Sequence, residues 1–336
     1  MMPRDALQDL CDRVLHHGRA AVFPHLMIPI AYIPTFNGRD RLRQALESIR
    51  NQSRRCEVVV VDNASDDGTA EMVRAEFPDC GLFELDRNRG FGQALNEAIA
   101  ATGSGPVMVL NNDVVLQPDF VEQMMAVFER GAPVVCGVLV RSADPGLIDS
   151  AGVVADRRTL MAFDYLEGSP VAQVAAAGPP LGATGGAALY DRDAFNSVGG
   201  FDPEIFAYYE DLDLALRLRS AGYAPELAPL ARATHLRSST LGDRSAAKYA
   251  LTGWSRGYLL RRYRVLGTAG GLARTLVAEI VVCSGQLVID RTANGIRGRV
   301  RGWKAAKGLS ARSLPSTGLT DFSFRAALKP RIRRYL

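Results

Sequence analysis

Glu210 and Asp211 are the residues of this sequence best suited to chemistry, because they stand together at the start of a strongly apolar stretch. Apolar side chains recur behind them at helical spacing: Leu212, Leu214, Ala215, Leu216 and Leu218. This spacing predicts a helix that buries most of its circumference and leaves the two acids at its mouth. A carboxylate there is kept ionised by the helix dipole and can accept a proton from a substrate hydroxyl. The pair is therefore a candidate general base, with simple helix capping as the alternative.

Strand and helix signals alternate along the N-terminal third of the chain, as a parallel sheet requires. Short apolar runs at Ile30–Ile33, Val58–Val61 and Val107–Leu110 predict buried strands. Helical faces are expected between them at Leu42, Ala45, Leu46 and Ile49, at Met72, Val73 and Phe77, and at Phe91, Leu95, Ala98 and Ile99. We therefore expect a doubly wound α/β sheet, in which ligands bind outside the carboxyl ends of the strands.

Polar residues collect where each of these strands ends. The three clusters are Pro34–Gly38, Asp62–Gly68 and Asn111–Asp113. Asp62 directly follows four valines, so its side chain leaves the sheet where a ligand can be bound. Each cluster alone is more typical of a turn or a helix cap. Three clusters at one edge of one sheet indicate a ligand site.

These motifs, in this order, resemble those of the inverting glycosyltransferases of family 2, over about residues 30–265. The matching segments are Ile33–Gly38, Val61–Thr69, Asn88–Asn96, Leu110–Val114, Gly185–Gly186, Gly199–Asp202 and Tyr209–Asp211. The resemblance is strongest to the rhamnosyltransferase-like branch that builds bacterial surface polysaccharides. It implies the GT-A fold, a Rossmann-like, mostly parallel sheet flanked by helices.

The resemblance also implies a role for each matching residue. Residues expected to bind the nucleotide donor are Pro34, Thr35, Asn37, Asp62, Asn63, Asn88, Gly90, Phe91, Asn96, Asn111 and Asn112. Residues expected on the acceptor side are Gly185, Gly186, Asp202 and Phe206. Asp211 is the expected base, and Glu210 is expected to orient it or to bind an acceptor hydroxyl. Because inversion is one in-line displacement, a single carboxylate suffices.

A divalent cation, Mg²⁺ or Mn²⁺, is expected to neutralise the departing diphosphate. Asp113 occupies the family's DxD position and is the expected ligand, but Asn111 replaces the first acid, so we expect weaker metal binding. His235 follows an expected strand at Ala228–Ala233; it resembles a family histidine that completes the metal site or contacts diphosphate. A structural role is the alternative for this histidine.

Composition limits the class of protein. The chain has 336 residues, 47% of them hydrophobic, enough for one large domain and an appendage. The five cysteines are scattered and indicate neither disulfides nor zinc, which favours a cytoplasmic setting. The first thirty residues lack a signal peptide pattern. The apolar run Leu276–Ile289 is interrupted by Glu279, Ser284 and Gln286, and we expect it to be too short to span a membrane.

The formal charge of +4 is unevenly distributed. Arg291–Leu336 holds twelve basic residues and one acid, a net charge of +11, and the preceding residues carry −7. An anionic membrane surface is the expected partner of this tail; a solvated tail is the alternative. Nucleic acid is not expected, because no recognition fold accompanies the charge. Tyr249–Arg264 mixes aromatic and basic residues, which suits either a membrane interface or a helical hairpin packed on the catalytic domain.

The expected organisation is therefore an N-terminal extension (1–28), a GT-A catalytic domain (29–245) and a helical, basic, membrane-associating region (246–336). The expected activity is sugar transfer from a nucleotide-diphosphate donor to a saccharide or lipid-linked acceptor, in the cytoplasm at the inner face of the membrane. One alternative is a sugar nucleotidyltransferase, which would need a Gly-rich loop with a basic residue after the first strand, where Gly38 stands alone. Another is a non-catalytic sugar-nucleotide-binding protein, against which Asp62, Asp113 and Asp211 together argue. No motif specifies the sugar, the nucleotide, the acceptor or the oligomeric state.

Overall fold

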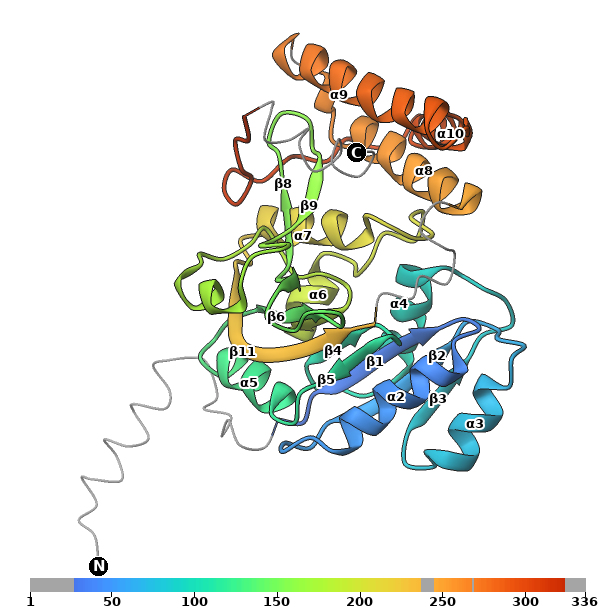
Figure 1. Ribbon diagram of the computed structural model, residues 1–336, viewed down its shortest axis with the longest axis vertical. Helices are drawn as coiled ribbons and strands as arrows, with labels where there is room; N and C mark the ends of the chain where they lie inside the picture. Colours follow the sequence, from blue (N-terminus) through green and yellow to red (C-terminus); the bar gives the residue numbers. More distant parts are fainter. Residues whose placement is uncertain (1–26, 237–244, 268, 324–336) are drawn as a thin grey trace, which may run out of the picture.

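The computed structural model describes residues 27–236, 245–267 and 269–323, and a mixed β-sheet lies at its centre (Figure 1). The strand order is β3-β2-β1-β4-β10-β6-β11-β5, with β7 beside β6. The strands are β1 (Ile30–Thr35), β2 (Glu57–Asp62), β3 (Gly81–Glu84), β4 (Val107–Leu110), β5 (Val114–Leu116), β6 (Val134–Arg141), β7 (Ile148–Ser150), β10 (Ala187–Tyr190) and β11 (Pro225–His235). The expected α/β class is confirmed.

Strand direction changes in the middle of the sheet. Strands β3, β2, β1 and β4 are parallel, which confirms the alternation expected from the N-terminal sequence. Strand β10 is antiparallel to both β4 and β6. Strand β11 is parallel to β6 and antiparallel to β5. The carboxyl ends of β1, β2 and β4 therefore meet at one edge, where the three polar clusters lie.

Helices cover both faces of the sheet, which is why the central strands are apolar throughout. They are α2 (Arg39–Arg50), α3 (Thr69–Glu76), α4 (Phe91–Ala101), α5 (Phe120–Phe128), α6 (Arg192–Ser197) and α7 (Glu210–Ser220). Side chains of β1 alternate between two cores: Ala31 and Ile33 pack with Leu42 of α2, whereas Ile30 and Tyr32 pack with Leu95 of α4. This alternation follows from the two-residue repeat of a strand.

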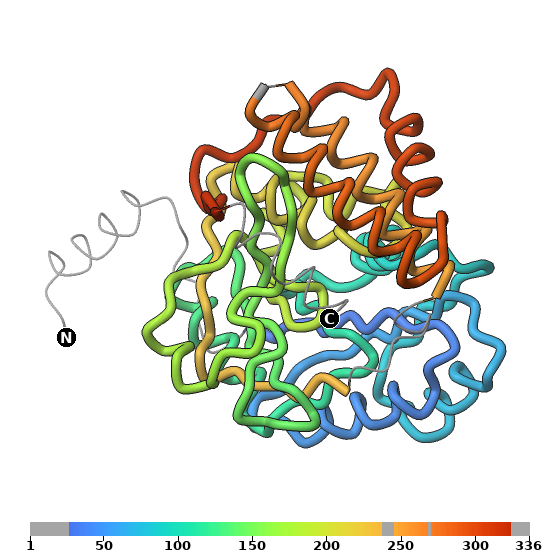
Figure 2. The backbone as a smooth tube through the Cα atoms, turned by 45° about the horizontal axis from the view of Figure 1, so that its top comes forward, coloured from blue at the N-terminus to red at the C-terminus, as the bar shows by residue number. Residues whose placement is uncertain are grey.

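Three further helices cover one end of the molecule: α8 (Ala246–Arg262), α9 (Ala269–Val288) and α10 (Asn294–Ala305). Both views place them at the end away from α2 and α3 (Figures 1 and 2). Helices α8 and α10 cross at backbone contact, because a Cβ atom on Gly257 would lie 2.0 Å from the carbonyl oxygen of Arg299 and one on Gly302 would lie 1.9 Å from that of Trp254. Glycine is thus required at this crossing.

Helix α8 is packed against the catalytic domain. Its Tyr258 and Leu259 are buried with Leu212 and Leu216 of α7 in one apolar cluster. Three of the four aromatic side chains of this stretch, Tyr249, Tyr258 and Tyr263, are buried and unavailable to a membrane, which goes against a membrane interface at Tyr249–Arg264. The alternative, helices packed on the catalytic domain, is what the structure shows.

Helix α9 is 20 residues long and begins before the apolar run noted in the sequence. By length and composition alone, Gly270–Val288 could cross a membrane, and 22% of it is buried in the structure. The expectation that the apolar run is too short to span a membrane is therefore wrong, because the helix that contains it is longer than the run. Length and composition alone do not show that the helix spans a membrane, since core helices of soluble proteins meet the same criterion. Glu279 is accommodated because its carboxylate pairs with Arg256 and Arg299.

After α10 the chain runs beside a hairpin formed earlier in the sequence by β8 (Val153–Ala155) and β9 (Ala162–Asp164). The N–H of Thr320 donates to Ala155 O, and the N–H of Arg157 donates to Thr320 O. Short 3-10 turns occur at Val171–Ala176 and Val265–Gly267. The domain limits at residues 28 and 245 stay predictions. Most of the expected N-terminal extension lies outside the described residues, as do residues 237–244 and the end of the basic tail, 324–336.

Candidate active site

The loops after β1 and β2 are joined by side-chain hydrogen bonds. Thr35 and Asp62 are register partners at the ends of these strands. Asn37, in the left-handed region with φ 49°, accepts from the N–H of Asp66 at 2.9 Å. Its own N–H donates to Ser65 Oγ at 3.0 Å. The sequence-predicted donor residues of the first two clusters are therefore brought together.

Asp62 and Asn63 hold different positions at this edge. Asp62 is buried, its Oδ1 accepts from Ser65, and burial raises the pKa of its carboxyl group. The Asn63 side chain bridges to the next loop, donating to Gly90 O at 2.9 Å and accepting from the N–H of Arg89 at 2.9 Å. Asn63 therefore shapes the third expected donor segment.

Gly90 joins this donor segment to the expected acceptor side. Asn88 Oδ1 accepts from the N–H of Gly90 at 2.9 Å, and Gly90 has φ 81°. A Cβ atom at Gly90 would lie 2.2 Å from the carbonyl oxygen of Phe206, which also accepts from the N–H of Phe91 at 2.8 Å. Phe206 as a whole residue is 41% exposed. Only glycine permits this approach.

Two expected binding residues make hydrogen bonds within the protein. The Asn96 amide is used by both backbone groups of Phe201, at 2.8 and 2.9 Å. Asp202 is buried and accepts from Tyr258 Oη at 2.9 Å and from Arg312 Nη1 at 2.7 Å. The donor role of Asn96 and the acceptor role of Asp202 stay predictions, and both side chains have partners within the protein.

Arg312 also reaches α7. Its Nη1 lies 2.6 Å from Asp213 Oδ1, and Arg217 Nε lies 2.7 Å from Asp213 Oδ2. Asp213 is fully buried. This acid therefore has a structural role beneath the candidate base.

The third polar cluster lies beside the first and beside β11. Asn112 Nδ2 donates to Thr35 Oγ1 at 2.9 Å. Asp113 Oδ2 lies 3.4 Å from His235 Nε2, because β11 pairs with β5 next to Asp113. The structure thus brings together the two residues expected to hold a metal ion.

Asp149 completes this arrangement and was missed in the sequence. Its Oδ2 lies 2.6 Å from His235 Nδ1, so Nε2 faces Asp113. Burial alone would lower the pKa of His235, but the hydrogen bonds to Asp113 and Asp149 outweigh it and raise the pKa to about 9. A carboxylate behind a ligating histidine fixes its ring orientation. No sequence signal connects the three-residue strand β7 with a histidine 86 residues later.

The donor set at Asp113 and His235 suits a weakly held divalent cation. In the described part of the chain, no three His, Cys, Asp or Glu side chains gather as a metal-binding group. Mg²⁺ is usually held by one or two protein carboxylates together with substrate phosphates and water. The Asp113 carboxylate fits that pattern, His235 would add one nitrogen ligand, and Asn111 is nearby in the same loop as Asp113.

Glu210 and Asp211 begin α7 as expected. They follow Tyr208 and Tyr209, which occupy the left-handed region in succession, at φ 68° and 69°. Such backbone is costly for residues other than glycine and is often found at functional sites. Burial raises the pKa of both acids, and for Glu210 the adjacent charge of Asp211 adds to the effect. Oε2 of Glu210 is buried without a hydrogen-bond partner.

The Gly185–Gly186 turn lies between the donor residues and this acid pair. The N–H of Gly185 donates to the Asp211 carboxylate, which also accepts from the N–H of Leu212 at 2.7 Å. A Cβ atom on Gly186 would lie 3.3 Å from Asn111 Nδ2, and one on Gly185 would lie 3.0 Å from the Phe91 ring. One short turn therefore contacts the donor loop, the DxD position and the candidate base.

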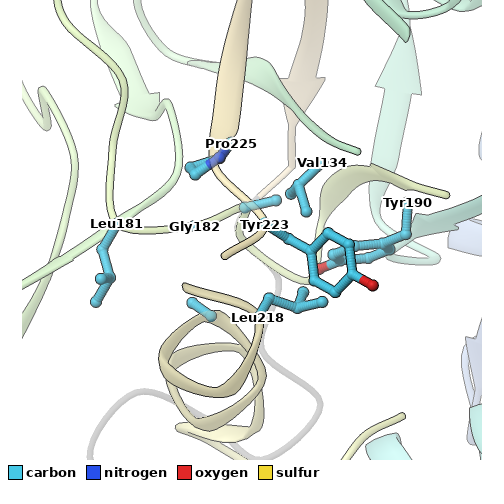
Figure 3. Close-up of a pocket in the computed structure, with 9 residues that line it drawn as sticks. Val134, Leu181, Gly182, Tyr190, Leu218, Tyr223 and Pro225 are labelled. Atoms are coloured by element: carbon cyan, nitrogen blue, oxygen red, sulfur yellow. The ribbon is translucent and has the colours of Figure 1, made fainter. Parts of the chain in front are cut away.

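Two cavities lie away from this edge. One is apolar, has no room for a water molecule, and is lined by side chains of α7 and the neighbouring strands, among them Val134, Tyr190 and Leu218 (Figure 3). The other, of about 80 Å³, lies beside Tyr209, and polar side chains of α8, α9 and α10 line it, among them Arg256 and Gln286. Neither contains the candidate metal ligands.

Comparison with known proteins identifies the family. Residues 31–199, half of the chain, match glycosyl transferase family 2. The chain is 27% identical over 251 residues to the N-acetylglucosaminyl-diphospho-decaprenol L-rhamnosyltransferase of Mycobacterium tuberculosis, covering 67% of this chain and 80% of that protein. It is 25% identical over 210 residues to the poly-beta-1,6-N-acetyl-D-glucosamine synthase of Staphylococcus aureus, covering 62% of this chain and 49% of the synthase.

The fold is shared with a solved glycosyltransferase structure. A crystal structure of GalNAc-T7 with UDP, GalNAc and Mn²⁺ matches with a TM-score of 0.56 at 12% identity, covering 85% of this chain and 55% of the other. This likeness shows the fold alone, and it agrees with the GT-A arrangement expected from the motifs. The chain belongs to glycosyltransferase family 2 and has its GT-A fold.

Proposed function

We propose that the protein transfers a rhamnose-like deoxyhexose or a hexose from a nucleotide-diphosphate donor to a saccharide or lipid-linked acceptor, with inversion. The contacts of the Gly185–Gly186 turn carry this proposal. Gly186 lies beside Asn111 on the donor side, and the N–H of Gly185 donates to Asp211. The rhamnosyltransferase relative, named for a diphospho-decaprenol substrate, supports assembly of bacterial surface polysaccharide as the setting.

In this mechanism Asp211 is the general base. It removes the proton from an acceptor hydroxyl as that oxygen bonds to the anomeric carbon, and the bond from that carbon to the diphosphate breaks on the opposite side. The nucleoside diphosphate leaves with the electron pair. Burial raises the pKa of Asp211, which makes its carboxylate a stronger proton acceptor. Glu210 orients this carboxylate or binds the acceptor hydroxyl.

The donor lies at the edge formed by the first three loops. Asp62, Pro34, Thr35 and Asn37 are proposed to contact the nucleotide, while Asn63, Asn88 and Gly90 hold the loop that carries Phe91. Asn111 and Asn112 are proposed to face the sugar diphosphate. The acceptor is proposed to lie along Gly185, Gly186 and the exposed Phe206.

A divalent cation, Mg²⁺ or Mn²⁺, is proposed as cofactor. Asp113 and His235 would hold it, and it would neutralise charge on the departing diphosphate. Asp149 would keep the His235 ring oriented through the 2.6 Å contact. The Mn²⁺ in the GalNAc-T7 structure supports divalent metal use in this fold.

We also propose that the protein acts in the cytoplasm as a peripheral protein at the inner face of the membrane. The charge of +11 on Arg291–Leu336 supports this placement, because anionic lipids attract clustered basic residues.

The test begins with donor identification. A panel of sugar nucleotides is screened for thermal stabilisation with and without Mn²⁺; a ligand at about 100 times its Kd stabilises by about 2.7 kcal/mol. The stabilising donor is then used in transfer assays, and NMR reads the configuration of the new glycosidic bond. We expect the inverted anomer and loss of transfer in Asp211→Asn, with Glu204→Gln, at an exposed acid of the loop before α7, as control. A retained anomer, or full activity of Asp211→Asn, would overturn the mechanism.

A further inference from the structure

Exposed apolar side chains are concentrated on one helix of this protein. Of the twelve large hydrophobic residues that are exposed in the described part of the chain, seven lie between Leu272 and Ile289. They include Ile280, which is 63% exposed, and Val288, which is 76% exposed. Isolated exposed leucines are ordinary on protein surfaces, whereas a contiguous patch indicates a partner.

These side chains share one side of α9, called here the α9 face. Its members are Leu272, Leu276, Val277, Ile280, Leu287 and Val288. Their spacing of three, four and seven residues places them on the same side of a helix. The charged residues of α9, Arg274 and Glu279, lie off this face and are partly buried. The face therefore carries no charge, and the exposed Ser284 lies within it.

The opposite side of α9 is fixed to the protein. Thr275, Ala278 and Gln286 are buried. Glu279 Oε1 lies 2.7 Å from Arg256 Nε, and its other oxygen pairs with Arg299. Crossing a bilayer would require exposure of this ion-paired carboxylate to hydrocarbon, which is costly. The helix is therefore suited to lie on a membrane and not to span one.

Positive charge follows the α9 face in the sequence. Exposed basic residues follow it in the chain: Arg291, Arg297, Arg301, Lys304 and Lys307. From Arg291 to Leu309 the sequence contains no acidic residue. An amphipathic helix with an apolar side and basic neighbours binds in the headgroup region of anionic bilayers.

The place of α9 in the molecule fits such a partner. Both views place α9 at the end of the molecule remote from the central sheet (Figures 1 and 2). Its inner side lines the cavity of about 80 Å³ together with Tyr209, the residue before the candidate acid pair. A bilayer against the outer side would therefore lie on the same end of the molecule as that cavity.

We infer that the α9 face docks in the plane of an anionic phospholipid bilayer, with the basic side chains of α10 at the lipid headgroups. This inference deepens the membrane association proposed above and rests on it, but it does not require that the enzyme transfer any particular sugar.

The test is vesicle co-sedimentation of the full chain without substrates. Ile280→Asp and Val288→Asp alter the α9 face, and Leu230→Asp, at a 59% exposed leucine on β11, is the matched control. On vesicles of phosphatidylcholine and phosphatidylglycerol we expect each face variant to bind at least tenfold more weakly than the wild type, because an apolar contact is lost. The Leu230→Asp variant should bind like the wild type.

The charge contribution is measured separately. Arg301→Glu and Lys304→Glu should each weaken binding about fivefold or more at low salt, and the difference should shrink at high salt. Vesicles of phosphatidylcholine alone should bind the wild type more weakly than the anionic mixture.

Three results would overturn the inference. Equal binding by the wild type and the face variants would exclude the α9 face. Wild-type protein that is dimeric by light scattering and becomes monomeric in Ile280→Asp, without vesicle binding, would make a second copy the partner. Protein that resists extraction from vesicles by high salt and carbonate would indicate a spanning helix. Transfer to a soluble acceptor, assayed on the same variants, separates each of these failures from failure of the proposed function.

Discussion

The contact between Gly90 and Phe206 predicts a large and specific effect of a single methyl group. Gly90 has φ 81° and ψ −175°, a conformation open essentially only to glycine. An alanine Cβ would also lie 2.2 Å from Phe206 O and 2.9 Å from its carbonyl carbon, both backbone atoms. The loop therefore cannot accept the methyl group without moving residue 206.

The cost of Gly90→Ala follows from two contributions. The forbidden backbone conformation costs about 1–3 kcal/mol. Displacement of residue 206 breaks the 2.8 Å hydrogen bond from Phe91, worth about 0.5–1.5 kcal/mol. We expect the free energy of unfolding to fall by about 2–4 kcal/mol and donor binding to weaken, because the displaced loop carries Asn88 and Phe91.

Gly199→Ala is the matched control. Gly199 also has a positive φ, of 79°, but a Cβ atom there would meet nothing within 4 Å. It should cost only about 1–2 kcal/mol, the strain of a left-handed alanine. Urea unfolding is followed by circular dichroism, because both tryptophans, Trp254 and Trp303, lie in the C-terminal helices and would report on that region alone. Equal losses in the two variants would refute the argument that the Phe206 backbone confines Gly90.

Three further outcomes are expected. Asp211→Asn should lower kcat by about 10²–10⁴-fold with an unchanged donor Kd, measured by transfer kinetics and calorimetry; unchanged kcat would remove Asp211 from the mechanism. Burial and the charge of Asp211 raise the pKa of Glu210 to about 8, so one proton is bound to the Glu210–Asp211 pair below that pH. We therefore expect kcat/KM to rise with pH up to about pH 8. Glu210→Gln should move this rise to lower pH, and an unchanged pH profile would contradict an interaction between the two acids. Asp149→Asn should weaken Mn²⁺-dependent donor binding about 10–100-fold, because the His235 ring is no longer held in place. In the presence of a chelator, the variant and the wild type should bind the donor equally well. An equal loss of donor binding with Mn²⁺ and with chelator would show that Asp149 has a structural role and does not act through the metal.

Strands β1, β2 and β4 and the helices α2, α3 and α4 were predictable because their signals are local. Val58–Val61 is a run of valines that only a strand buried on both faces accommodates, and it lies within β2. The reversal at β10 was not predictable, because Ala187–Tyr190 is apolar in either direction and its neighbours β4 and β6 are set by distant parts of the chain. Strand direction is a property of the whole sheet.

The candidate site also has residues that the sequence predicts and residues that it does not. Asn37 and Asn96 both match the family motifs, yet the Asn96 amide is used by Phe201, 105 residues later. The partner that uses an amide cannot be read from the amide's own neighbours. Likewise, the sequence indicates His235 but not Asp149, which contacts it across 86 residues. Residue type predicts what a side chain can do, and tertiary contact decides which of its atoms remain free to do it.

The ion cluster beneath α7 has a consequence for the order in which the protein matures. Asp202 and Asp213 are synthesised 110 and 99 residues before Arg312, the cation that lies between them. At typical translation rates of about 5–20 residues per second, Arg312 is synthesised roughly 5–20 s after these acids. Burial would raise the pKa of Asp202, and Arg312 lowers it. The helix that bears the candidate base is therefore electrostatically complete only after α8, α9 and α10 have left the ribosome, which delays a finished catalytic site until nearly all of the described chain exists.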